Sequence, residues 1–210
     1  MNLPKGFVSG SVAAGLKSTG ALDLTLIQNL GPNFDSAVVF TSNKVVAAPV
    51  IWSRQVAKGG VVRAVVLNSG GANACTGPQG FADTHKTAEH VGALLNVSAG
   101  EVIVCSTGLI GELLPMDRIL KGLDSIASVL TSDGLETSAR AIMTTDSVPK
   151  IATASAHGVE FAGIAKGAGM LAPALATMLS VVMTDAVVSG KAQEIFARLT
   201  DRTFNRIDSD

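Results

Sequence analysis

Charged side chains are scarce in this sequence: they make up 16% of its 210 residues, whereas hydrophobic residues make up 47%. Such a composition favours a compact, heavily buried globular protein over a disordered chain. The 16 Lys and Arg residues balance 17 Asp and Glu residues, and no block of basic residues stands out. Nucleic-acid binding therefore lacks the electrostatic footprint that phosphate contacts require, and we expect no nucleic-acid partner.

Cysteine is scarce as well, with Cys75 and Cys105 as the two cysteines of the sequence. The first residues, MNLPKGFVSG, lack the apolar core of a secretory signal, so we expect a cytoplasmic protein with reduced thiols. A zinc site needs more ligands than isolated cysteines and 3 scattered histidines offer. The sequence therefore predicts neither a disulfide nor a metal site.

Residues 167–184 carry no charge, yet they fall short of the about 20 apolar residues that a membrane-spanning helix needs. Glycines and Pro173 interrupt the first half of this stretch. We therefore expect no membrane span, but a loop that leads Thr177 into a short buried strand over 177–184. This threonine is either an inert strand residue or a nucleophile whose proton a neighbouring group takes.

Hydrophobic periodicity predicts the remaining elements. Strands are expected at 22–27, 36–41, 61–68 and 101–105, helices at 80–96, 116–130 and 135–143, a hairpin at 151–156 and 159–165, and a last helix from a cap at Ser189 to Phe204. Because strands and helices do not alternate strictly, a doubly wound parallel sheet is disfavoured. The sequence predicts an α/β layered sandwich with an antiparallel or mixed sheet.

Two stretches of small residues follow predicted strands. Residues 68–77, NSGGANACTG, either line a cleft or let two elements pack closely. The tripeptide Ser106-Thr107-Gly108 offers a hydroxyl and a backbone N–H that can stabilise an oxyanion, although it is also ordinary turn chemistry. Judged from the residues alone, Lys166 is a solvated charge at the end of a strand.

Four stretches, taken together in their order and spacing, resemble one known family. They are NSGGANACTG at 68–77, CSTGLIG at 105–111, AIMTTD at 141–146, and KGAGMLAP followed by ATML within 166–179. Over nearly the whole chain the sequence resembles ornithine acetyltransferase, also called glutamate N-acetyltransferase, of arginine biosynthesis.

The resemblance implies a self-processing fold of the N-terminal-nucleophile type, in which a precursor cuts itself between Ala176 and Thr177. Residues 1–176 would then form the α-chain domain, and 177–210 would begin the β chain of an enzyme with two α and two β chains. Cleavage frees the α-amine of Thr177, whose unperturbed pKa is about 8. That amine can take the proton of the same residue's hydroxyl, which makes Thr177 a competent nucleophile.

The implied reaction transfers the acetyl group of N2-acetylornithine to Thr177 as an ester and then to glutamate, without a cofactor. Thr107 and Gly108 match the family's oxyanion hole. Thr144, Lys166 and Thr177 match its substrate-binding positions, where the lysine would pair with a substrate carboxylate. The sequence does not distinguish whether acetyl-CoA serves as a second donor.

Family members continue for roughly as many residues again beyond Asp210, and their remaining substrate contacts lie in that part. The alternatives to a complete acetyltransferase are a truncated inactive remnant, a separately made subunit, and a related self-processing aminopeptidase. Acetyl transfer without peptide cleavage would exclude the aminopeptidase.

Overall fold

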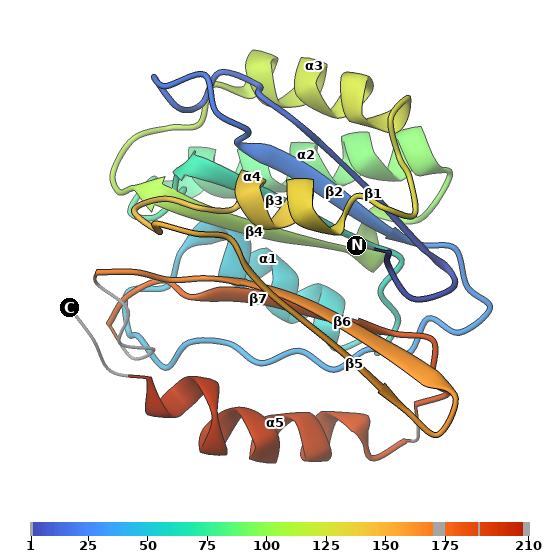
Figure 1. Ribbon diagram of the computed structural model, residues 1–210. Coiled ribbons are helices and arrows are strands. Elements are labelled where there is room, and N and C mark those ends of the chain that lie inside the picture. The colour runs from blue at the N-terminus through green and yellow to red at the C-terminus, as the bar shows by residue number, and fades with distance from the viewer. Residues whose placement is uncertain (1, 170–174, 189, 208–210) are drawn as a thin grey trace.

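The computed structural model describes residues 2–169, 175–188 and 190–207, which form a layered α/β fold built on two sheets (Figure 1). The first sheet contains β1 (Phe7–Val12), β2 (Leu24–Asn29), β3 (Ala64–Gly71) and β4 (Val102–Leu109) in that order. The second contains β5 (Lys150–Ala156), β6 (Val159–Lys166) and β7 (Leu179–Thr184). The helices are α1 (Ala48–Ala57), α2 (Gly77–Leu95), α3 (Met116–Ala127), α4 (Leu135–Ala141) and α5 (Ala192–Arg202), with short 3₁₀ turns at Ala99–Glu101 and Phe204–Arg206.

The first sheet is mixed and is covered on both faces. β1, β2 and β3 are antiparallel neighbours, and β4 runs parallel to β3. Alternate residues of its strands, such as Leu24 and Val66, pack against Val91 of α2 and Leu123 of α3. The side chains on the other face of these strands, such as Leu67, pack against α4 and the second sheet. This period-2 division explains why both faces of the sheet are apolar.

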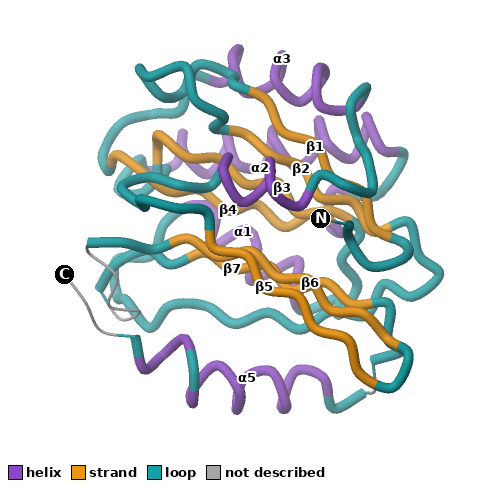
Figure 2. Tube along the Cα trace, viewed as in Figure 1, coloured by secondary structure: helices purple, strands orange, loops and turns teal. Residues whose placement is uncertain are grey.

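The layers follow from these two cores. Figure 2 shows α2 and α3 on one side of the first sheet, the second sheet on the other side, and α5 beyond the second sheet. Helix α4 lies between the sheets, where it contacts strands of both. The predicted layered α/β fold with mixed and antiparallel sheets is confirmed.

The second sheet is an antiparallel hairpin to which β7 adds a third strand. Its tight turn places both His157 (φ 53°) and Gly158 (φ 80°) in the left-handed region, as a type I′ hairpin turn requires. In the pairing of β6 with β7, Lys166 lies opposite Leu179. The two ends of residues 167–178 are therefore held next to each other.

Helix α1, which the sequence analysis missed, covers the outer edge of β4. The hydroxyl of Ser53 donates to the carbonyl of Val104 (2.9 Å) and accepts from its N–H (3.1 Å). The indole N–H of Trp52 donates to the carbonyl of Val102 (3.0 Å). These side chains occupy backbone groups that an exposed edge strand would otherwise offer to another chain.

Some predicted local structure was wrong. Residues 36–41 form no strand, because Val38 exchanges its backbone hydrogen bonds with the side-chain amide of Gln193 in α5 instead of with a strand. The tripeptide at 106–108 is not a turn, since it continues β4. The predicted roles of Pro173 and Ser189 fall outside the described residues.

Candidate active site

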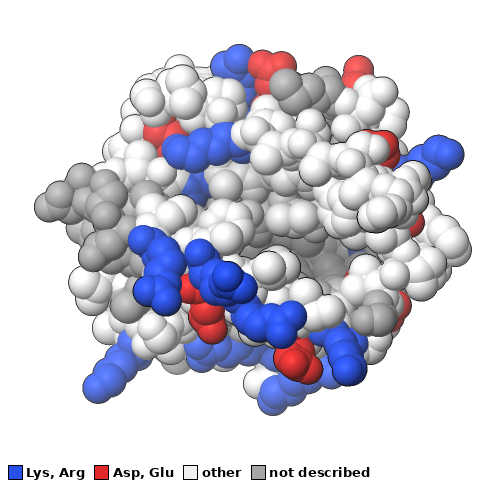
Figure 3. All heavy atoms as spheres, turned by 60° about the horizontal axis from the view of Figure 1, so that its bottom comes forward, with Lys and Arg blue, Asp and Glu red and all other residues white. Residues whose placement is uncertain are grey.

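A cavity of about 2740 Å³ lies at the seam between the two sheets. Its wall includes β4, the end of β6, the start of β7, the extended segment 36–43 and α5. Figure 3 turns the α5 end of the molecule forward and shows a hollow in the surface, with Lys and Arg side chains gathered beside it. All of the site residues predicted from the sequence line this cavity: Thr107, Gly108, Thr144, Lys166, Ala176 and Thr177.

The wall that belongs to the first sheet is built from stacked backbone. Gly108 (φ 129°) pairs with Gly70 (φ 106°) across the parallel strands, at an irregularity in their register. A Cβ on Gly108 would lie 2.5 Å from the carbonyl carbon of Gly70, and a Cβ on Gly70 would lie 2.7 Å from the carbonyl oxygen of Leu16. Only glycine fits both positions. The backbone next to Thr107 is therefore fixed by close packing, as a preorganised oxyanion site requires.

Buried side chains reinforce this wall from behind. The hydroxyl of Ser106 donates to Oδ1 of Asn68 (2.6 Å), and Nδ2 of Asn68 donates to the carbonyl of Gly71 (2.9 Å). Gly70, Ala72 and other residues of 68–77 also line the cavity. Both roles considered for the small-residue stretch therefore apply to it, because it packs closely against β4 and lines the cleft.

Lys166 is not the solvated charge that its sequence context suggests, because its side chain is only 4% exposed. Its Nζ donates to Oγ1 of Thr144 at 2.6 Å and to Oγ1 of Thr107 at 3.4 Å. Burial lowers the pKa of Lys166, while the nearby carboxylate of Asp146 offsets part of that effect and Lys150 adds to it. Lys166 thus links Thr107 of β4 to Thr144, which lies in the connection between α4 and β5.

Asp146 is the residue of this site to which the sequence analysis gave no role. Its carboxylate accepts hydrogen bonds from the backbone N–H of Gly167 (2.8 Å), the backbone N–H of Thr144 (3.1 Å) and the ammonium group of Lys150 (2.5 Å). Burial raises the pKa of Asp146, but these hydrogen bonds and the charge of Lys166 outweigh it and bring the pKa down to about 2. The residue is an anion at neutral pH.

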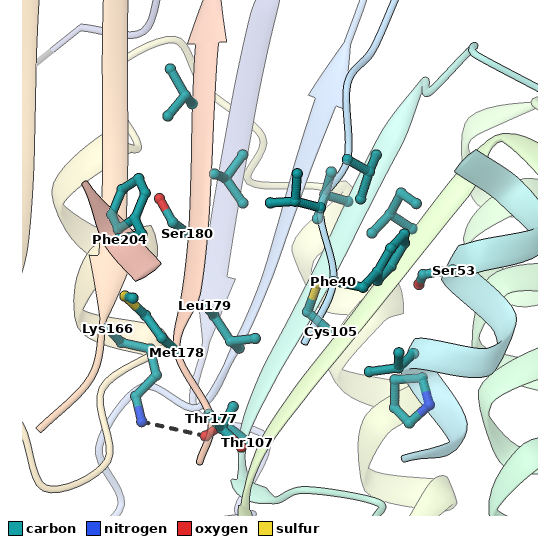
Figure 4. A pocket seen from close by; sticks show the side chains of 18 of the residues that line it. Phe40, Ser53, Cys105, Thr107, Lys166, Thr177, Met178, Leu179, Ser180 and Phe204 are labelled. Carbon is teal, nitrogen blue, oxygen red and sulfur yellow. Dashed lines mark hydrogen bonds between the residues drawn. The ribbon is translucent and has the colours of Figure 1, made fainter. Parts of the chain in front are cut away.

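Thr177 reaches the site through the pairing of the second sheet. It precedes Leu179 by two residues, and Leu179 is the register partner of Lys166. Figure 4 shows Thr177, Thr107 and the ammonium group of Lys166 at the same end of the cavity. The Ala176–Thr177 peptide bond therefore lies at the end of the cavity that carries Lys166.

Both cysteines are free thiols. Cys75 is exposed and lines the cavity, whereas burial raises the pKa of Cys105 to about 12, so that its thiol stays protonated. The ranges that the structure describes contain no group of three His, Cys, Asp or Glu side chains placed to hold a metal ion. None of the helices in these ranges combines the length and hydropathy that crossing a bilayer requires.

The fold of this chain is similar to that of a solved structure. The crystal structure of ornithine acetyltransferase from Mycobacterium tuberculosis, complexed with ornithine, is similar to it with a TM-score of 0.73 and 50% sequence identity. The match covers 82% of this chain and 94% of that chain. The arrangement of the two sheets and their helices is therefore that of an ornithine acetyltransferase chain.

The family follows from the sequence comparisons. The family model of the ArgJ family matches residues 8–210. The arginine biosynthesis bifunctional protein ArgJ of Streptomyces coelicolor is 56% identical over 207 residues, which make up 98% of this chain and 54% of that protein. The protein of the same name from M. tuberculosis is 53% identical over 99% of this chain and 54% of its own length. The chain belongs to the ArgJ family, and it spans about half the length of these curated relatives.

Proposed function

We propose that this chain forms the N-terminal part of a glutamate N-acetyltransferase, which moves the acetyl group of N2-acetylornithine to glutamate in arginine biosynthesis. The observation that carries the proposal is the convergence of Thr177, Thr107–Gly108 and Lys166 on one end of one cavity. A nucleophile, an oxyanion site and a cation for a substrate carboxylate are the parts that acyl transfer between amino acids requires.

In the first half-reaction, the hydroxyl oxygen of Thr177 attacks the acetyl carbonyl carbon, and the α-amine of Thr177 takes the hydroxyl proton. The tetrahedral oxyanion is held by the hydroxyl of Thr107 and the N–H of Gly108. The C–N bond then breaks, the proton passes to the leaving amino group, and ornithine departs. An acetyl ester remains on Thr177.

In the second half-reaction, the amino group of glutamate attacks the ester carbonyl, and the hydroxyl of Thr177 recovers its proton as N-acetylglutamate leaves. Lys166 and Thr144 bind the α-carboxylate that donor and acceptor share, because a buried ammonium group attracts an anion strongly. One substrate subsite therefore serves both half-reactions, as a ping-pong scheme requires. The scheme assigns no step to a cofactor.

We further propose that the family's polypeptide cuts itself between Ala176 and Thr177, which divides this chain into an α part, 1–176, and the start of a β part, 177–210. The M. tuberculosis relative is matched over 54% of its length, whereas the crystallised chain from that organism is matched over 94%. A crystallised chain of about half the full length supports such a division. Its match to 82% of this chain is close to the share that 1–176 represents.

The division would run through the second sheet, because β6 precedes the predicted cleavage point and β7 follows it. The two parts would then remain one folded unit after cleavage. The apolar cavity wall, together with exposed Leu175, Val182 and Val187, would be covered by the rest of the family's polypeptide in a cytoplasmic assembly of two α and two β chains.

The proposal is tested on the native gene product that carries this sequence. Mass spectrometry of the purified protein should find chains that end at Ala176 and begin at Thr177. With N2-acetylornithine and glutamate it should release ornithine and form N-acetylglutamate in equal amounts, and a parallel assay with acetyl-CoA determines whether that donor is also used. Peptide hydrolysis without acetyl transfer would favour the aminopeptidase alternative, and an intact, inactive protein would favour the remnant.

A further inference from the structure

We propose that Asp146 is a positioning residue of this site, whose buried carboxylate holds the ammonium group of Lys166 and the hydroxyl of Thr144 in place for the substrate carboxylate. The proposal rests on the proposed function, because it assigns Asp146 a task in the same substrate subsite. Nothing in the motif that ends at Asp146 distinguishes this task from a helix-terminating turn. The three-dimensional contacts do.

The hydrogen bonds of Asp146 join two segments of the site. One oxygen accepts from the N–H of Gly167, the residue after Lys166, and the other accepts from the N–H of Thr144. The carboxylate thus ties the end of β6 to the connection between α4 and β5. One of these hydrogen bonds fixes the backbone next to Lys166, and the other fixes the backbone of Thr144. The side chains of Lys166 and Thr144 are themselves joined by a 2.6 Å hydrogen bond.

The negative charge of Asp146 also faces the buried ammonium group of Lys166. Nζ of Lys166 lies 3.9 Å from Oδ2 of Asp146, and the two side chains are 4% and 1% exposed. Lys150 also binds Asp146, but its side chain is 44% exposed, so water can solvate its charge. Lys17 of the loop before β2 lies close enough for its charge to interact with both Lys166 and Asp146. Asp146 is therefore the anion that compensates the buried ammonium group of Lys166. The positive charges of Lys150 and Lys17 repel that ammonium group.

Loss of the negative charge of Asp146 should change how substrate binding depends on pH. Removing the negative charge of Asp146 leaves burial and Lys150 unopposed, and both of these lower the pKa of Lys166. Lys166 then loses its proton at a lower pH than in the native protein. A subsite that needs the ammonium form fails as the pH rises through that pKa, so the alkaline limit of substrate binding should move to lower pH.

The variant Asp146→Asn tests this effect because asparagine keeps the size and one acceptor oxygen but loses the charge and the second acceptor. In the native gene product, we expect KM for N2-acetylornithine at neutral pH to rise about tenfold or more, since the partner of a buried charge is removed. The alkaline limb of kcat/KM should move to lower pH. The matched control is Asp133→Asn, which removes the same charge from an exposed loop and should change neither quantity.

A merely structural aspartate would behave differently: its loss would lower the melting temperature and the amount of active enzyme while KM and the alkaline limb stayed unchanged. That result would overturn the proposal. If Asp146→Asn does not fold, Asp146→Glu takes its place, because it keeps the charge but shifts the carboxylate by one methylene. It should preserve the alkaline limb and raise KM, and an unchanged KM would overturn the positioning role.

The outcome for the native protein separates the two proposals. If the native gene product transfers no acetyl group, the proposed function fails and the role of Asp146 in it fails as well. If the native protein transfers acetyl groups and Asp146→Asn matches it in KM and in the alkaline limb, only the role of Asp146 fails.

Discussion

The two sheets contribute unequal parts to one site. In β2 every residue from Leu24 to Ile27 is buried, and the first sheet has apolar cores on both faces and α1 along its edge. In β5 nearly every residue is exposed, and Val182 of β7 is 50% exposed. The thoroughly buried sheet carries the proposed oxyanion wall, whereas the lightly covered sheet carries Lys166 and leads to Thr177.

This difference suits the chemistry that each wall is proposed to perform. An oxyanion site works by being fixed before the reaction, and stacked glycine backbone inside a buried sheet provides that rigidity. The proposed nucleophile Thr177 and the proposed carboxylate-binding Lys166 line the cavity that a substrate must enter and leave. Variants on the two sheets should therefore fail in different ways.

Among the variants that compare the two sheets, the largest effect is expected from Gly108→Ala on the buried sheet. The new Cβ would meet the backbone of Gly70 at 2.5 Å with φ at 129°, so the oxyanion wall must move. Loss of one oxyanion donor typically costs about 10²–10³ in kcat, and we expect at least that loss here. The measurement is steady-state kinetics of acetyl transfer alongside thermal unfolding.

Gly111→Ala is the matched control for that variant. Gly111 also has a positive φ, 89°, but a Cβ there meets no heavy atom within 4 Å. We expect only the backbone cost of about 1–2 kcal/mol in the free energy of unfolding, with kcat unchanged. Equal losses of kcat in the two variants would show that stacking against Gly70 is not what matters.

Two substitutions that should change only the stability compare the packing of the two sheets. Leu67 of β3 is fully buried, so Leu67→Ala should lower the free energy of unfolding by about 2–5 kcal/mol. Thr153→Ala on the exposed strand β5 should change it by about 1 kcal/mol or less. Urea unfolding of both variants makes the comparison, and similar losses would mean that the second sheet is as thoroughly packed as the first.

The sequence predicted most of the fold because its cores are periodic. Residues 116–130 repeat at helical spacing and contain α3 (Met116–Ala127), and the β-branched run at 61–68 overlaps β3 (Ala64–Gly71). Helix α1 was missed because its buried face includes Ser53, whose hydroxyl is satisfied only by the edge of β4. The strand expected at 36–41 was wrong, since a strand needs a partner that the sequence does not specify.

Local sequence patterns also predicted the site only in part. The predicted site residues line one cavity, yet their assignment came from resemblance, because no local pattern places residue 107 near residue 166. The burial of Lys166 and the role of Asp146 depend on tertiary contacts. The spacing of Asp146 and Lys150, four residues apart, gives no local signal of their ion pair, because that spacing brings side chains together only on a helix and Pro149 lies between them.

The central claim is that Thr177, brought by the second sheet to the oxyanion wall of the first, carries the acetyl group. The most direct measurement is to mix the native gene product with N2-acetylornithine in the absence of glutamate, quench it with acid and analyse its peptides by mass spectrometry. We predict one acetyl group on Thr177 that disappears when glutamate is added, and none in Thr177→Ala, which should also neither cleave itself nor transfer. An acetyl group on another residue, or measurable acetyl transfer by Thr177→Ala, would contradict the account.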